Sequence, residues 1–61
     1  MKITIKIDTK NDAFQGGNNG GETARILREL ADRISNEQLS RHSNRNLRDV
    51  NGNVVGTFTC G

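Results

Sequence analysis

Alternation of apolar and polar residues near the start of the chain predicts a β-strand. In Lys2 to Ile7 (KITIKI) every second residue is isoleucine, and the positions between carry lysine or threonine. Successive side chains of a strand point to opposite faces of a sheet, so the isoleucines would share one face. We therefore expect a strand with one face in the core and one in water.

A helical period replaces this alternation from Glu22 to about Gln38. The apolar residues recur at spacings of three and four, and they are Ala24, Ile26, Leu27, Leu30, Ala31 and Ile34. Opposite charges one turn apart are expected to pair on the outer face, each pair contributing about 0.2–0.5 kcal/mol. These pairs are Arg25 with Glu29, Arg28 with Asp32, and Glu29 with Arg33. The pattern predicts an amphipathic helix that frays from Ser35 onward.

A second β pattern opens at Leu47 and continues to Cys60, interrupted by Asn51-Gly52. Asn-Gly between two such runs is a strong hairpin signal. A two-residue turn, which we favour, would place on the core face Leu47, Val54, Phe58 and Cys60. A three-residue turn ending at Asn53 would instead group Val50, Val54 and Phe58.

Together these elements predict one α+β domain over residues 1–61 with the order β-α-β-β. We expect a three-stranded, mainly antiparallel sheet with one amphipathic helix packed on one face. The other face would be polar and would carry Lys2, Thr4, Lys6, Thr57 and Thr59. Residues 9–21 and 37–45 are expected to be flexible connectors, with Phe14 anchoring the first to the core. A chain of this length buries only about 60% of its unfolded surface, so its core must be thin.

Charge and cysteine content narrow the possible environments. Nine Lys and Arg residues against seven Asp and Glu give a net charge of +2. No stretch approaches the roughly 18 apolar residues that cross a bilayer, and the N-terminus lacks the features of a signal peptide. We therefore expect a cytoplasmic protein without a membrane partner. The single cysteine, Cys60, excludes an intrachain disulfide and leaves little scope for a cysteine-histidine metal site.

The glycine-rich stretch Gln15 to Thr23 (QGGNNGGET) invites comparison with phosphate-binding loops. Such a loop follows a strand closely and, in nucleoside triphosphatases, ends in Gly-Lys-Ser/Thr. Here the predicted strand ends near Ile7, no lysine follows, and Glu22 places negative charge where an anion would sit. We interpret the stretch as a flexible connector.

No pair of residues suggests catalysis. His42 is the only histidine and lies in a polar stretch without an orienting partner, so we expect it to be exposed to solvent. Cys60 is expected to be either a small buried apolar residue or a frayed terminal thiol. We therefore expect no enzyme activity, no catalytic residue, no cofactor and no metal.

Cationic side chains are the best candidates for binding a partner. The candidate residues are Lys2, Lys6, Arg28, Arg33, Arg41, Arg45 and Arg48. No acidic residue occurs from Gln38 to Arg48, so the arginines there could bind phosphates or an acidic protein surface. Nucleic-acid binders of this size usually carry aromatic residues that stack on bases, whereas this chain has two Phe and no Tyr or Trp.

Three segments together resemble a family of very small proteins encoded by tailed bacteriophages and prophages. The segments are KITIKIDTKNDAF at Lys2 to Phe14, TARILRELADRI at Thr23 to Ile34 and LRDVNGNVVGT at Leu47 to Thr57. The resemblance covers the chain except the glycine tract and the connector from Ser35 to Asn46. It implies an accessory phage protein made inside a bacterium. The family brings no catalytic residues, and its shared RD.NGN..G element is typical of hairpin geometry.

Because small phage accessory proteins commonly occupy a surface on a host protein, the resemblance favours a protein-binding function. An inhibitor of a host defence system, similar in kind to anti-CRISPR proteins, is the sharpest form of this hypothesis. The alternative is a nucleic-acid-binding accessory or regulatory protein that uses the segment from Arg41 to Arg48. A homodimer formed through the unpaired edge of the small sheet is a third expectation.

Overall fold

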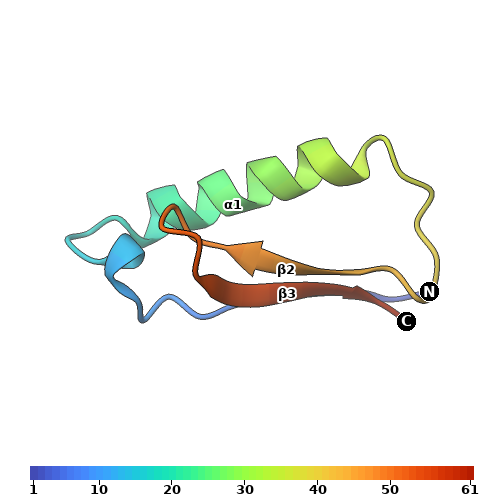
Figure 1. Cartoon of the computed structure of the whole chain (residues 1–61), viewed down its shortest axis with the longest axis horizontal. Helices are drawn as coiled ribbons and strands as arrows, with labels where there is room; N and C mark the ends of the chain where they lie inside the picture. The colour runs from blue at the N-terminus through green and yellow to red at the C-terminus, as the bar shows by residue number, and fades with distance from the viewer.

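The computed structural model describes all 61 residues and has one helix packed on a three-stranded antiparallel sheet (Figure 1). The elements are β1 (Ile3–Ile7), the short 3-10 helix η1 (Asp12–Phe14), α1 (Asn19–Ile34), β2 (Asn44–Arg48) and β3 (Val54–Cys60). The strand order is β1-β3-β2, so β3 is central and both other strands form edges. The predicted α+β fold is confirmed. No helix is long and apolar enough to span a lipid bilayer.

The register of the strands builds the predicted polar face. Thr59 of β3 lies between Thr4 of β1 and Asn44 of β2, and Thr57 lies between Lys6 and Asn46. These side chains point away from α1, because alternate residues of β3 on the other side, such as Phe58, are buried in the core. The strand β2 begins at Asn44, three residues before the predicted start at Leu47. The polar residues 44–46 belong to the strand because they pair with β3. Residues 44 and 45 therefore do not belong to the second connector.

The β2–β3 hairpin differs from both predicted turns. Its loop is Val50–Gly52, closed by the Asp49 N–H, which donates to the Asn53 carbonyl at 2.9 Å, with Gly52 at φ 86°. This is the geometry of a three-residue hairpin loop, in which the position with left-handed backbone favours glycine. The two-residue turn was therefore wrong. The alternative was also wrong, since its loop ended one residue later and it placed Val50 in the core, where the structure leaves Val50 67% exposed.

An irregularity beside this loop changes which valine faces the core. Leu47 pairs with Gly56, but Arg48 pairs with Val54, so Val55 is an extra residue in β3. Such a bulge reverses the alternation of side chains along the strand. Val55 is consequently 8% exposed and Val54 50% exposed, the opposite of the predicted placement.

The helix α1 begins at Asn19, three residues before the predicted Glu22, and ends at Ile34, directly before the segment from Ser35 where fraying was expected. Part of the first predicted connector is thus structured, because Gly20 and Gly21 lie in the first turn of α1 and η1 precedes it. Gly16 at φ 70° and Gly17 at φ 80° reverse the chain between these two helices. The reversal packs η1 against α1 and places Phe14 in the core at 3% exposure, as predicted.

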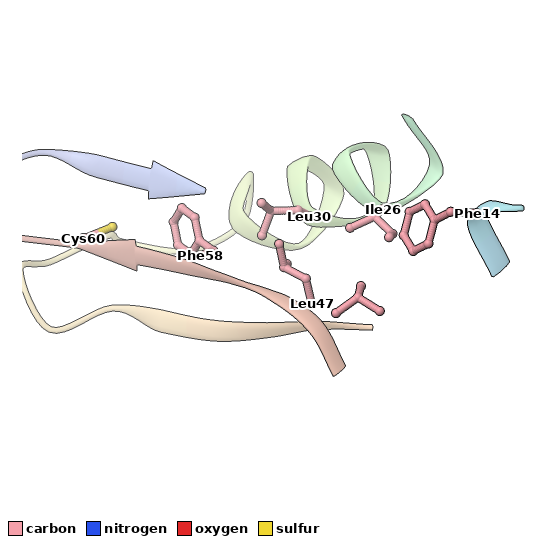
Figure 2. Close-up of a cluster of buried hydrophobic side chains, with 7 residues drawn as sticks. Phe14, Ile26, Leu30, Leu47, Phe58 and Cys60 are labelled. Atoms are coloured by element: carbon pink, nitrogen blue, oxygen red, sulfur yellow. The ribbon is translucent and has the colours of Figure 1, made fainter. Parts of the chain in front are cut away.

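Figure 2 shows core side chains that follow one another from Cys60 and Phe58 of the sheet past Leu30 and Ile26 of α1 to Phe14, with Leu47 beside them. The members of the core are Phe14, Ile26, Leu30, Leu47, Val55, Phe58 and Cys60. The helix contributes a narrower stripe than predicted, since Leu27 is 40% exposed. Of the three strands, β2 lies closest to α1, so the helix covers little of β1. Ile3 and Ile5, predicted to be core residues, are 47% and 44% exposed, and only Ile7 packs against the core.

Candidate interaction surfaces

A groove between α1 and β2 brings together three of the predicted binding residues. Its lining is Ile26, Glu29, Leu30, Arg33, Arg45, Asn46, Leu47 and Arg48, and its cavity volume is about 80 Å³. The helix contributes residues spaced three and four apart, which share one side of α1, and the edge strand β2 contributes four consecutive residues. Leu30 and Leu47 give the groove an apolar base. We call this the α1–β2 groove.

Two arginines of the α1–β2 groove lack a carboxylate partner. Arg45 is paired with Glu37, in the connector that follows α1. The carboxylate of Glu29 is engaged by the Arg25 guanidinium, with Nη1 and Oε2 3.0 Å apart. Arg33 forms no ion pair, and Arg48 donates only to the Gly52 carbonyl, at 3.0 Å from Nη1. Arg33 therefore adds uncompensated positive charge to a groove with an apolar base. Arg48 adds positive charge at the β2 border of the groove, where its side chain alternates with buried Leu47 and lies on the sheet face remote from α1.

A buried carboxylate fixes the end of this groove. Glu22 is 4% exposed, and its two oxygens accept hydrogen bonds from Arg25, at 2.7 Å from Nε and 3.1 Å from Nη2. The Val50 N–H donates to Oε2 at 2.8 Å, and Arg25 Nη2 also donates to the Arg48 carbonyl at 3.3 Å. The paired Arg25 guanidinium holds the pKa of Glu22 below its usual value in spite of burial. This pair ties α1 to the hairpin loop and to β2.

Asp49 organises the hairpin loop in the same way. It is 4% exposed, and burial by itself raises its pKa. Hydrogen bonds from the Asn53 N–H, the Asn11 side chain, the Asn53 side chain and the Asn51 N–H outweigh burial and hold the pKa below its usual value. The RD.NGN..G element therefore serves hairpin geometry, as the sequence indicated. Because these donors saturate the carboxylate, Asp49 is a structural residue and not a candidate site for a ligand.

Both buried carboxylates were missed at the sequence level, although signals for each were present. Glu22 lies four residues before Ile26 and eight before Leu30, so it extends the buried stripe of α1 by one turn. Asp49 directly precedes the turn residues, where an aspartate side chain commonly accepts N–H groups two residues ahead. Of the three predicted charge pairs on the helix, only Arg25–Glu29 forms.

The sheet face remote from α1 is a second cationic surface, which we call the open sheet face. Its exposed or half-exposed polar side chains are Lys2, Thr4, Lys6, Asn44, Asn46, Arg48, Thr57 and Thr59. One carboxylate, that of Asp8, follows β1 directly along the chain. Because β1 and β2 form opposite edges of the sheet, Lys2 and Lys6 lie on the edge remote from the α1–β2 groove.

The remaining candidates do not join either surface. Arg28 lies on the exposed face of α1, opposite Ile26 and Leu30, and Arg41 is exposed in the connector before β2. His42 is exposed, as expected, and Cys60 is the buried end of β3. No three His, Cys, Asp or Glu side chains lie close enough together to hold a metal ion.

Comparison of the chain with protein-family models, curated proteins and solved structures found no match.

Proposed function

We propose that this protein acts by binding an acidic surface of another protein through the α1–β2 groove. The observation that carries the proposal is that two arginines without a carboxylate partner border a groove with an apolar base, Arg33 from α1 and Arg48 from β2. Arginine is enriched at the centres of protein interfaces, because its planar guanidinium binds carboxylates with two hydrogen bonds and packs on apolar atoms.

The two sides of the groove are held in place before any partner arrives. Glu22 and Arg25 connect α1 to the hairpin loop and to the Arg48 carbonyl, and Leu30 and Leu47 pack in the core. A preformed site loses less conformational entropy on binding than one that must be assembled. This supports recognition by a fixed shape and charge pattern.

The resemblance to small proteins of tailed phages and prophages gives this binding function its biological setting. On that basis we propose that the protein works in the cytoplasm of a bacterial host and binds a host protein or protein complex. Inhibition of a host defence system, as by anti-CRISPR proteins, is the specific form we propose. Occupation of a partner's surface needs only a small rigid scaffold with a charged face, which this chain has.

Charge reversal in the groove tests the proposal. Tagged protein would be used to recover partners from a bacterial lysate at low salt, and the affinity of the purified pair would then be measured. We expect Arg33→Glu and Arg48→Glu each to weaken binding about tenfold or more. Arg28→Glu is the matched control, because it makes the same charge change on the opposite side of α1. Equal losses in all three variants, or the recovery of no partner, would count against the proposal.

The open sheet face favours nucleic acid as a second candidate partner. Lys2 and Lys6 lie there among threonine and asparagine side chains, and neither lysine forms an ion pair. Phosphate binding through such a surface gives an affinity that falls steeply with salt and depends little on sequence. A gel-shift assay with random duplex and single strands at several salt concentrations distinguishes this candidate. Binding that is lost in Lys2→Glu and Lys6→Glu but kept in Arg33→Glu would favour it over the groove.

A further inference from the structure

The strand β1 presents a free edge to solvent. Lys2 exchanges both backbone hydrogen bonds with Gly61, and the Asp8 N–H donates to the Val55 carbonyl. In an antiparallel ladder the hydrogen-bonded residues alternate, so the even-numbered residues of β1 bond to β3. The N–H and C=O groups of Ile3, Ile5 and Ile7 therefore point away from the sheet. An edge of this kind is a template for another strand.

Exposed apolar side chains border the same edge. Ile3 and Ile5 lie on the α1 side of the sheet at 47% and 44% exposure, because α1 is displaced toward β2. Leu27 of α1 is 40% exposed and lines a shallow hollow with Thr9, which follows β1. The unused hydrogen bonds and the uncovered apolar surface thus occur together.

We propose that two copies of this chain associate by antiparallel pairing of their β1 edges, with Ile5 of each copy opposite Ile5 of the other. Ile3 of one copy then lies opposite Ile7 of the second. All three positions have outward N–H and C=O groups, so every one enters the new ladder. Their side chains all point to the α1 side, where they form one apolar stripe across the two-fold axis.

Charge selects this register over its neighbour. With Ile5 on the axis, Lys2 of each copy lies opposite Asp8 of the other, and Lys6 lies opposite Thr4. A register shifted to put Thr4 on the axis would instead place Lys2 opposite Lys6, which is unfavourable. A register with Lys6 on the axis would place the two Lys6 side chains opposite each other. A register with Ile7 on the axis would pair Lys6 with Asp8, but it would set Ile5 opposite Thr9 and Ile3 opposite Asn11. Among the residues of β1, only Ile5 as the centre pairs a lysine with Asp8 and keeps the isoleucines opposite one another.

The resulting dimer would have a six-stranded sheet with both helices on one face. Its interface lies on the edge opposite β2, so both α1–β2 grooves stay free. This proposal is independent of the function proposed above, because it uses a different edge of the sheet. If both hold, the dimer offers two partner sites.

Complementary charge variants test both the association and its register. Lys2→Asp places carboxylates opposite each other at both ends of the paired strands, and Asp8→Lys places ammonium groups there. The two positions are about 20 Å apart within one strand, so they do not pair inside one copy. In sedimentation velocity we expect the natural chain to dimerise and each variant to dimerise at least about tenfold more weakly. An equimolar mixture of the two variants should recover dimers, since each Asp then meets a Lys.

Two further variants complete the test. Lys6→Thr removes a charge on the same strand that has no ionic partner in this register, so its dimer affinity should stay within about threefold of the natural value. Ile5→Lys puts two ammonium groups on the axis and should abolish the dimer. Circular dichroism would verify that each variant is folded. A natural chain that is monomeric up to about 1 mM, or a mixture no more dimeric than its components, would overturn the proposal.

Discussion

At the scale of single residues, Gly56 shows how closely the strands approach. It lies in β3 between Ile7 and Leu47, next to the bulge at Val55. A Cβ atom at Gly56 would overlap the Lys6 carbonyl oxygen and come within 3.0 Å of the Ile7 Cα. Both are backbone atoms, so a larger residue at this position requires β1 to move.

We therefore predict that Gly56→Ala destabilises the fold by about 2–4 kcal/mol, the range of a strained or overpacked site. Gly20→Ala is the matched control, since Gly20 is helical and a Cβ there meets nothing within 4 Å. The control should stabilise the protein by up to about 1 kcal/mol, because alanine has less freedom in the unfolded chain. Urea unfolding measures both changes. Similar effects of the two substitutions would contradict the close approach of β1 and β3.

At the scale of elements, the bulge in β3 decides the composition of the core. Val54 and Val55 are adjacent and chemically identical, yet only Val55 is buried. The reason is the shift of pairing between Leu47 and Arg48, which is imposed by the three-residue loop and the hydrogen bonds to Asp49. A strand without this irregularity would turn Val54 to the core instead.

A pair of truncations tests this element. Val55→Ala removes two buried methyl groups and should cost about 1–3 kcal/mol in the free energy of unfolding. Val54→Ala removes the same atoms from a half-exposed site and should change it by about 0.5 kcal/mol or less. Thermal unfolding followed by circular dichroism provides the comparison. A larger loss from Val54→Ala would mean that the regular hairpin forms and the bulge does not.

At the scale of the whole molecule, two buried carboxylates connect the elements and couple stability to pH. Glu22 joins α1 to the hairpin loop, and Asp49 holds the loop itself. The pKa of each is lowered in the folded protein, from ordinary values of 4.5 and 3.8. The folded state thus binds fewer protons than the unfolded state in acid, so protonation favours unfolding.

Stability should therefore be fully present above about pH 5 and should fall as the pH drops through 4 toward the lowered pKa values. Urea midpoints measured from pH 7 to about pH 2.5 would show this decline. In Glu22→Gln the stability at pH 7 should be lower and its decline in acid shallower, because one of the two carboxylates is absent. Asp32→Asn, at an exposed position of α1 without an ion pair, is the control and should retain the full decline. An unchanged acid profile in Glu22→Gln would show that Glu22 does not couple stability to pH.

The pattern of residues alone was sufficient for the element order, the α+β class, the polar sheet face and the anchoring by Phe14. Each of these follows from local periodicity or from an apolar residue in a polar stretch, so nearest neighbours along the chain carry the information. The candidate arginines were also identifiable by charge. Which of them line the α1–β2 groove could not be identified from the sequence. Arg33 and Arg45 line the same groove only because α1 packs beside β2.

Tertiary structure alone decided the burial of Glu22 and Asp49, the choice of Val55 over Val54 and the exposure of Ile3 and Ile5. Each depends on where an element lies against another: α1 is displaced toward β2, and the loop gathers N–H groups around Asp49. An alternating strand predicts which side chains share a face, but it carries no information about whether a helix will cover that face. For this reason the apolar side of β1, which the sequence predicts to be in the core, borders an open edge in the folded protein.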